Sequence, residues 1–306
     1  MGIVVIGATF VDIKGFPEDT YIPTGRNVGR VEYIHGGVAR NVVEDIANAE
    51  LRPTFLGIVD DTPMGADVVK KLKNHKVNTE YILERPDGMG TWLAVFDNNG
   101  DVAGSISKRP NMLPVLDLLE QKGDEIFSKA DSMVIEVDIN KEIVKKALDL
   151  CEKYGIQSFA LVSNMSIAVK RRDLLQRFTC FICNQQEAGM LFVDDYSGKT
   201  PLEMEEILAQ KVKEAKIPSV VVTLGAQGAV FADLQGNSGY CPARNVVVKD
   251  TTGAGDAFCA GVAIGMTYGD SMTHALEIGS VLAASVITSS ENVCPRFQPS
   301  ELGIRV

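Results

Sequence analysis

The sequence has a deficit of positive charge. Its 306 residues include 30 Lys and Arg against 40 Asp and Glu, which gives a formal net charge of −10 and a pI of about 4.9. Proteins that bind a nucleic-acid backbone need a basic surface, so we expect no nucleic-acid partner. A few local groups can still hold a small anion, and small-molecule functions therefore stay open.

Long uncharged apolar runs are also missing. No stretch approaches the roughly 18 residues needed to span a membrane. The apolar segment from Met1 to Val11 has no cationic region and no clear cleavage site. We interpret it as a first strand rather than a signal peptide, and we expect no membrane partner.

Cysteine is sparse and scattered. Most of the six cysteines lie in apolar segments, as Cys151 and Cys259 do, which is typical of reduced thiols in a cytoplasmic protein. Cys180-Phe181-Ile182-Cys183 is formally a C-x-x-C motif, but no second cysteine pair or nearby histidine completes a zinc site. We interpret the motif as buried strand and expect a cytoplasmic location.

Apolar β-rich runs alternate with amphipathic helical patterns along most of the chain. This alternation predicts an α/β fold with a mostly parallel central sheet and helices on both faces. The predicted strands are Ile3–Ile6, Thr54–Val59, Thr79–Leu83, Ser132–Val137, Gln157–Leu161, Cys180–Cys183 and Ser219–Thr223. The predicted helices are Val38–Ala49, Met64–His75, Lys141–Tyr154, Val169–Arg177, Glu187–Phe192 and Leu202–Ala215.

Two segments interrupt the alternation, at residues 12–35 and 90–107. The second contains Asn98-Asn99-Gly100 between alternating runs, which is a strong hairpin signal. We predict that the two segments form a small antiparallel sheet, a lid that excludes water from a cleft. Residues 1–11, 36–89 and 108–306 then form the core. Because free sheet edges favour pairing, a homodimer through the lid is a further hypothesis.

The most informative stretch is Asp250-Thr251-Thr252-Gly253-Ala254-Gly255-Asp256. We interpret Val246–Val248 before it as the end of a buried strand and Ala257–Met266 after it as a buried helix. Glycines at such a turn admit a ligand to the backbone, and a helix N-terminus attracts anions. Asp256 could then accept a proton from a hydroxyl that attacks a phosphoryl group. The alternative is that Asp256 only caps the helix.

Two other phosphate-binding motifs are incomplete. Ser197-Gly198-Lys199-Thr200 is similar to the end of a P-loop, but Val193 occupies the place of its first glycine. Gly253-Ala254-Gly255 begins like a dinucleotide fingerprint, but Phe258 occupies the place of the third glycine. A P-loop enzyme and an NAD enzyme are therefore disfavoured.

Five motifs, in this order along nearly the whole chain, resemble the ribokinase-like (pfkB) family of carbohydrate and nucleoside kinases. They are Gly7 with Asp12, Gly36-Gly37-Val38-Ala39-Arg40-Asn41, Asn184-Gln185-Gln186-Glu187, Thr223-Leu224-Gly225-Ala226-Gln227-Gly228 and the Asp250–Asp256 stretch. The resemblance implies a ribokinase-like fold. It also implies transfer of the γ-phosphate of ATP to a hydroxymethyl group of a sugar or nucleoside.

The same resemblance implies roles for individual residues. Asp256 would be the general base, and the backbone of Gly253, Ala254 and Gly255 would form an anion hole. Asp12, Gly36, Gly37 and Asn41 would bind the acceptor, while Asn184, Thr223, Gly225 and Gly228 would bind the nucleotide. Asn184 and Glu187 would hold Mg²⁺, mostly through water. A K⁺ site near Asp250 and Thr252, built from backbone carbonyls, is a further hypothesis.

Several of these residues have structural alternatives. Asp12 could cap a turn, and Asn41 could be an ordinary polar residue early in a helix. Glu187 could be a solvated charge in a first helical turn. Thr223 and Gly225 could be only a strand end and a turn.

The acceptor is less clearly indicated. The variant Gly36–Asn41, the hairpin TWLAVFDNNGDV and the segment Ile287–Val293 resemble the pseudouridine kinase branch. We therefore expect a nucleoside phosphorylated at its ribose 5′-hydroxyl, pseudouridine first. Free ribose, fructose and a keto-deoxy sugar acid are the alternatives. Val162-Ser163-Asn164 departs from the Asp-Pro pair that many members have.

Residues around the hairpin leave further questions open. Lys108, Arg109 and Asn111 follow it and would either contact substrate or mark a solvated edge, and His35 would face the substrate or lie at the hinge of the lid. Proteins of other classes, a catalytically silent ligand sensor or a scaffold, are also alternatives. A sensor would have no need to keep Asp256.

Overall fold

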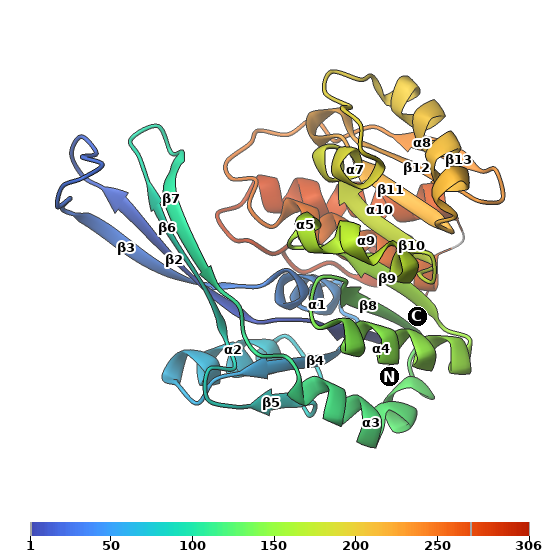
Figure 1. The fold of residues 1–306 in the computed structure, drawn as a ribbon, viewed down its shortest axis with the longest axis horizontal. Helices are drawn as coiled ribbons and strands as arrows, with labels where there is room; N and C mark the ends of the chain where they lie inside the picture. Colours follow the sequence, from blue (N-terminus) through green and yellow to red (C-terminus); the bar gives the residue numbers. More distant parts are fainter. Residues whose placement is uncertain (1, 270, 306) are drawn as a thin grey trace.

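The computed structural model describes residues 2–269 and 271–305, which form one large and one small β-sheet (Figure 1). Residues 1, 270 and 306, assigned above to the core, lie outside the described residues. The large sheet has the strand order β13-β12-β11-β10-β9-β8-β1-β4-β5 and the small sheet β3-β2-β6-β7. The predicted α/β fold with a large, mostly parallel sheet and a separate small one is confirmed.

Seven strands of the large sheet run parallel. They are β1 (Ile3–Ile6), β4 (Thr54–Val59), β5 (Ile82–Glu84), β8 (Ser132–Glu136), β9 (Gln157–Leu161), β10 (Cys180–Asn184) and β11 (Ser219–Thr223). The antiparallel strands β12 (Ala229–Asp233) and β13 (Ser238–Cys241) extend one edge. The central strands are mostly apolar because both faces of the sheet are covered.

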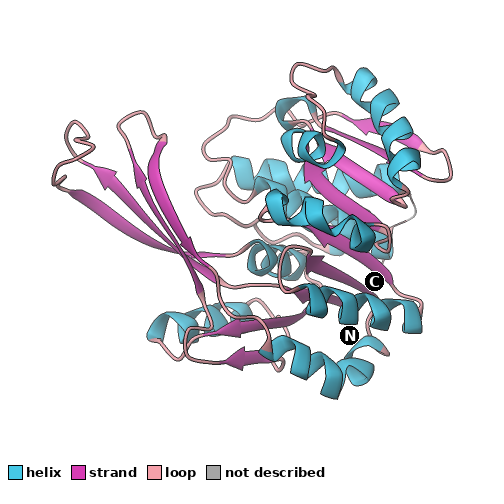
Figure 2. Cartoon of the chain, in the orientation of Figure 1, coloured by secondary structure: helices cyan, strands magenta, loops and turns pink. Residues whose placement is uncertain are grey.

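Helices cover each face of the large sheet and form two hydrophobic cores (Figure 2). Alternate residues of β1 show this directly, since Val4 and Ile6 belong to one core and Ile3 and Val5 to the other. The first core includes α3 (Pro114–Phe127), α4 (Lys141–Tyr154), α7 (Gln185–Phe192) and α8 (Pro201–Ala215). The second includes α1 (Val38–Asn48), α2 (Pro63–Asn74), α9 (Ala254–Tyr268) and α10 (Met272–Ile287).

The small sheet projects from the core as two hairpins. β2 (Phe10–Pro17) pairs antiparallel with β3 (Gly29–Gly36), and β6 (Gly90–Phe96) pairs antiparallel with β7 (Val102–Lys108). The central pair, β2 with β6, is parallel, whereas we predicted an antiparallel sheet throughout. Both strands leave the core at the carboxyl-end edge of the large sheet and run outward together, which makes the parallel pairing unavoidable.

Several predicted elements were wrong in detail. The predicted helix Val169–Arg177 is split into α5 (Met165–Ala168), the 3₁₀ turn η1 (Val169–Arg171) and α6 (Arg172–Leu175). The predicted strand Thr79–Leu83 is reduced to β5, which starts at Ile82. Val246–Val248 is not a strand. It is a loop in which the exposed fractions of Val247 and Val248 are 83% and 60%.

The structure also has two further short 3₁₀ turns, η2 (Gly225–Gln227) and η3 (Pro299–Leu302). Across the described ranges, no helix combines the length and the apolar character that a membrane crossing requires.

Candidate active site

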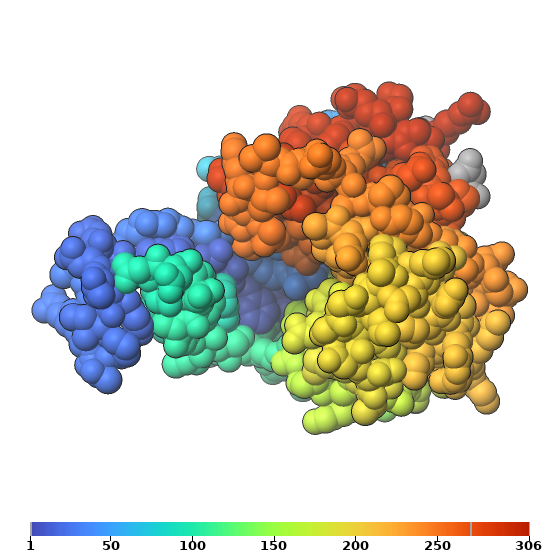
Figure 3. Space-filling view, turned by 90° about the horizontal axis from the view of Figure 1, so that it is seen from above, coloured from blue at the N-terminus to red at the C-terminus, as the bar shows by residue number. Residues whose placement is uncertain are grey.

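The candidate site lies where the parallel strands of the large sheet end and the helices α1 and α9 begin. Seen from above, the surface is hollowed between the small sheet, in blue and green, and the rest of the molecule (Figure 3). The carboxyl ends of parallel strands are the usual place for ligands in α/β proteins. All five motifs from the sequence border this region or the cavity next to it.

The Asp250–Asp256 stretch enters α9 after Gly253, the residue that precedes the helix. Its φ of 82° is in the left-handed region, and a Cβ built on it would lie 2.1 Å from the carbonyl oxygen of Asn292. Only glycine fits such a position. No side chain caps α9. The N–H of Ala254 donates to the carbonyl oxygen of Thr251 at 3.2 Å, whereas within the described residues the N–H groups of Gly255 and Asp256 have no hydrogen-bond acceptor and stay available to an anion. The helix begins at Ala254, one turn earlier than predicted, which places Asp256 inside the first turn.

Asp256, in the first turn of α9, contacts Asn41 of α1. The Nδ2 group of Asn41 donates a hydrogen bond of 2.6 Å to Oδ2 of Asp256. Burial raises the pKa of Asp256 to about 6, against the opposing effects of the Asn41 hydrogen bond and the positive charge of Arg40. Asp256 is therefore not a helix cap. It is a half-buried carboxylate whose pKa lies close to neutral pH, as a general base requires.

The residues predicted to bind the acceptor gather beside Asp256. A Cβ on Gly36 would lie 2.6 Å from Oδ1 of Asp12, and one on Gly37 would lie 2.5 Å from the carbonyl oxygen of Ala8. Gly37 also has a φ of 100°. Burial raises the pKa of Asp12, and Asp12 in turn acts electrostatically on Asp256. Gly36 thus lets the backbone approach Asp12, and Gly37 lets it approach the segment that connects β1 to β2.

Glu136, at the end of β8, belongs to the same region and was missed in the sequence. Its Oε1 accepts a 2.9 Å hydrogen bond from the N–H of Ala39 at the start of α1. Burial and the negative charge of Asp138 raise its pKa. An acidic residue that ends an otherwise apolar strand, in Ser132-Met133-Val134-Ile135-Glu136, was the signal that could have revealed it.

A cavity of about 550 Å³ lies on the other side of α9. Thr223, Gly225 and Gly228 line it, together with Phe258 of α9 and apolar residues of α10. Val246 and Val248 also line it, which explains the wrong strand prediction, because their apolar side chains face an open cavity and not a core. Its size and apolar walls suit a heterocyclic base with its sugar.

Asn184 and Glu187 form a reciprocal cap at the start of α7. Asn184 Oδ1 accepts from the N–H of Glu187 (2.9 Å), and Glu187 Oε2 accepts from the N–H of Asn184 (2.8 Å). Burial raises the pKa of Glu187. Within the described residues, Oε1 of Glu187 has no hydrogen bond and is free to act as a ligand. One carboxylate and one amide oxygen fit Mg²⁺, which keeps most of its water.

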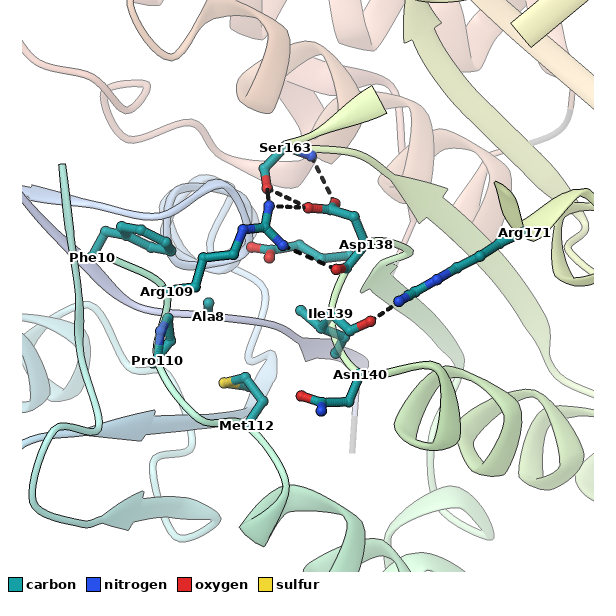
Figure 4. Close-up of a pocket in the computed structure, with 11 residues that line it drawn as sticks. Ala8, Phe10, Arg109, Pro110, Met112, Asp138, Ile139, Asn140, Ser163 and Arg171 are labelled. Carbon is teal, nitrogen blue, oxygen red and sulfur yellow. Dashed lines mark hydrogen bonds and ion pairs between the residues drawn. The ribbon is translucent and has the colours of Figure 1, made fainter. Parts of the chain in front are cut away.

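A second, smaller cavity of about 210 Å³ lies between Glu136 and the base of the small sheet, where Phe10 begins β2 and Arg109 follows β7 (Figure 4). Arg109 spans it, with Nη2 2.6 Å from Oδ2 of Asp138. Ser163, from the Val162-Ser163-Asn164 segment noted above, donates to Asp138 through its N–H (2.9 Å) and its hydroxyl (2.8 Å). The remaining lining residues are Ala8, Phe10, Pro110, Met112, Glu136, Ile139, Asn140 and Arg171.

The other residues near the hairpin lie outside this cavity. Lys108 pairs with the exposed carboxylate of Asp87, and Asn111 accepts a hydrogen bond from the N–H of Leu113. His35 lies 3.2 Å from Asp67 of α2. Arg109 is thus the member of that group that lines a cavity beside the site.

Comparison with known proteins gives consistent results. The sequence profile of the pfkB family carbohydrate kinases matches residues 2–294. The chain is 34% identical to guanosine-inosine kinase from Exiguobacterium acetylicum over 95% of each chain. It is 24% identical to pseudouridine kinase from Escherichia coli over 95% of this chain and 93% of that one. Ribokinase from Arabidopsis thaliana, solved with ribose and ATP, superposes with a TM-score of 0.86 at 19% identity, covering 98% and 97% of the two chains.

Proposed function

Since this chain belongs to the pfkB family and is a kinase, we propose that it phosphorylates the ribose 5′-hydroxyl of a purine nucleoside with a 6-oxo group, such as guanosine or inosine, using ATP. The observation that carries the proposal is its full-length similarity to guanosine-inosine kinase. Pseudouridine is the second candidate, favoured by the Gly36–Asn41 variant and by the second relative. The uracil ring of pseudouridine has adjacent N–H and C=O groups, as 6-oxopurines do.

In this proposal each group of the site has one task. Asp256 accepts the proton of the 5′-hydroxyl, and the N–H groups from Gly253 to Asp256 stabilise the charge of the transferring phosphoryl group. Asp12, Gly36, Gly37 and Asn41 orient the ribose. ATP supplies the phosphoryl group, and its base would occupy the cavity beside Thr223, Gly225 and Gly228. Asn184 and Glu187 would hold Mg²⁺, which offsets phosphate charge. A K⁺ ion near Asp250 and Thr252 completes the proposal.

The smaller cavity is our candidate for the acceptor's base. Glu136 lines this cavity and also accepts a hydrogen bond at the start of α1, so the cavity lies close to Asn41. Asn140 precedes α4 without capping it and lines the cavity. A free carboxamide can pair with the adjacent N–H and C=O groups of a 6-oxopurine. The ring of Phe10 supplies an aromatic surface for the same base.

The test is ADP release from ATP and Mg²⁺ with guanosine, inosine, pseudouridine, adenosine, uridine, ribose, fructose and keto-deoxygluconate, each in K⁺ and in a bulky organic cation. We expect guanosine and inosine to have the highest kcat/KM. A signal restricted to a free sugar would contradict a nucleoside acceptor. Binding of guanosine without turnover would instead favour a ligand sensor.

Filling the smaller cavity separates base binding from catalysis. Met112→Trp is expected to raise the KM for the preferred nucleoside by about 10-fold or more, because each lost contact of about 1.4 kcal/mol is worth a factor of ten. The KM for ATP should not change. Met190→Trp, on the exposed side of α7, is the matched control. A nucleoside KM that is equal in both variants would place the base elsewhere.

We also propose that the small sheet is a lid and a dimer surface. Strand register puts Val31, Tyr33, Leu93, Val95 and Ile106 on one face of it, opposite the face that contains Asp12. All five are exposed, and apolar patches of this kind usually mark an interface. A second copy of the same face is the occupant we propose, and sedimentation velocity would detect the dimer.

A further inference from the structure

Helix α1 has a buried polar side in addition to the apolar side expected from its sequence. Arg40, Asn41, Glu44, Asp45 and Asn48 are all buried. Buried polar groups are costly unless they are hydrogen bonded. A helix that places five of them next to an active site therefore needs a reason beyond packing.

Arg40 lies at the centre of this polar side, with its side chain 1% exposed. Its Nη1 donates to Oε2 of Glu44 at 2.6 Å, and the other oxygen of Glu44 lies 3.1 Å from Nζ of Lys71. Its Nη2 donates both to the carbonyl oxygen of His35 and to Oδ1 of Asn41. One rigid guanidinium thus joins a buried carboxylate, the end of β3 and the side chain of Asn41.

The contact with Asn41 determines which way that amide faces. An asparagine side chain has an acceptor end and a donor end, and its neighbours decide between the two orientations. Arg40 can only donate, so it requires Oδ1 of Asn41 to face it. Nδ2 of Asn292 also approaches Oδ1 of Asn41, at 3.4 Å. The donor end of Asn41 is left to face Oδ2 of Asp256 at 2.6 Å.

The reverse orientation would be unfavourable for catalysis. The amide oxygen of Asn41 would then face the Asp256 carboxylate, and two acceptors would stand within hydrogen-bond distance. Asp256 would relieve the repulsion by keeping a proton, and a protonated carboxyl cannot act as a base.

We propose that Arg40 is a positioning residue for phosphoryl transfer: it fixes the Asn41 amide so that Asn41 donates to Oδ2 of Asp256 and Oδ1 remains free for the acceptor's proton. This inference rests on the proposed role of Asp256 as general base. It concerns the Arg that distinguishes the Gly-Gly-Val-Ala-Arg-Asn variant in this chain.

A double-mutant cycle tests the inference. Arg40→Met is expected to lower kcat by about 10- to 100-fold, the scale of a misplaced catalytic group, with the KM for ATP unchanged. Asn41→Ala should also lower kcat. In the Asn41→Ala background, Arg40→Met should have no further effect on kcat, because Arg40 acts through Asn41. Multiplicative losses in the double variant would overturn the proposal.

The pH profile provides a readout that simple destabilisation does not move. The titratable and charged groups that act on Asp256 or are acted on by it are Arg40, Asp45, Asp12, Glu136, Glu187 and Cys259. Arg40→Met removes a positive charge and the fixed donor, so the rising limb of kcat/KM should move to higher pH. Asn41→Ala should move it in the same direction. A limb that stays in place would count against the proposal.

Two further variants keep the test decisive if Arg40→Met folds poorly. Arg40→Lys retains the ion pair with Glu44, but an ammonium cannot reproduce the planar fork, so kcat should still fall. Wild-type kcat in Arg40→Lys would overturn the proposal. Lys71→Met removes another positive charge beside Glu44, and its kcat should equal that of the wild type. If Asp256→Asn is inactive but the effects of Arg40→Met and Asn41→Ala on kcat multiply, this inference is rejected and the proposed mechanism stands. If Asp256→Asn is active, the proposed mechanism itself is rejected.

Discussion

Asp256→Asn is expected to lower kcat by about 10²- to 10⁴-fold, the contribution typical of a general base. Asparagine has nearly the same shape and cannot accept the proton of the acceptor hydroxyl. The KM for ATP should stay near the wild-type value, because the cavity that we propose for the nucleotide lies on the other side of α9. Steady-state assays of ADP release measure both quantities. Near-normal turnover would remove Asp256 from the mechanism.

The pH dependence of the wild type follows from the same group. Burial raises the pKa of Asp256 to about 6, and the base must be deprotonated to work. Activity expressed as kcat/KM should therefore rise with pH through about 6. In Asp256→Asn this limb should disappear from whatever activity remains.

Stability should show the opposite trend. A carboxyl whose pKa is higher in the folded protein than its ordinary value of 3.8 stabilises the fold fully below pH 3.8. That stabilisation is lost as the pH rises through about 6. Asp256→Asn carries no charge there, so it should unfold at a higher temperature than the wild type at pH 7. Near pH 4 the two midpoints should converge, which thermal unfolding at both pH values would show.

Gly253→Ala is expected to have the second large effect. The added Cβ would lie 2.1 Å from the carbonyl oxygen of Asn292, so the loop or the segment around Asn292 must move. The N–H groups that precede Asp256 would move with the loop, and loss of one such donor typically lowers kcat by about 10²- to 10³-fold. Kinetics with the preferred nucleoside, together with a thermal unfolding midpoint, would measure both consequences.

Gly198→Ala is the matched control for backbone strain. Gly198 also has a positive φ, 74°, but nothing lies within 4 Å of its added Cβ. It should lose about 1 kcal/mol of stability, as a left-handed alanine does, and keep wild-type turnover. Equal kcat values in Gly253→Ala and Gly198→Ala would show that the close approach to Asn292 is unimportant.

The sequence predicted the layered core well because its signals are local. The strands Ile3–Ile6, Thr54–Val59, Gln157–Leu161 and Ser219–Thr223 were predicted with the bounds that the structure has. Such runs are continuous and apolar because they are buried on both faces. Val246–Val248 has the same composition, yet it lines an open cavity. Composition alone cannot distinguish a wall of a ligand cavity from a wall of the core.

The site was predictable where glycines and carboxylates stand in a recognisable order. Glu136 was missed because a lone acid at a strand end forms no pattern. The polar side of α1 was missed for another reason. Its partners, such as Asn292 and Cys294, lie about 250 positions away and depend on tertiary structure. The roles assigned to Asp12, Asn184 and Glu187 stay predictions, and Asn184 and Glu187 additionally cap α7.

The parallel pairing of β2 with β6 has a consequence for folding order. The two strands come from parts of the chain about 80 residues apart, and each begins only a few residues beyond a strand of the large sheet. The small sheet therefore closes a long chain loop, and such loops form late because their entropy must be offset first. Asp12 belongs to this sheet, so we expect the proposed acceptor side of the site to assemble last in folding and to open first in local unfolding.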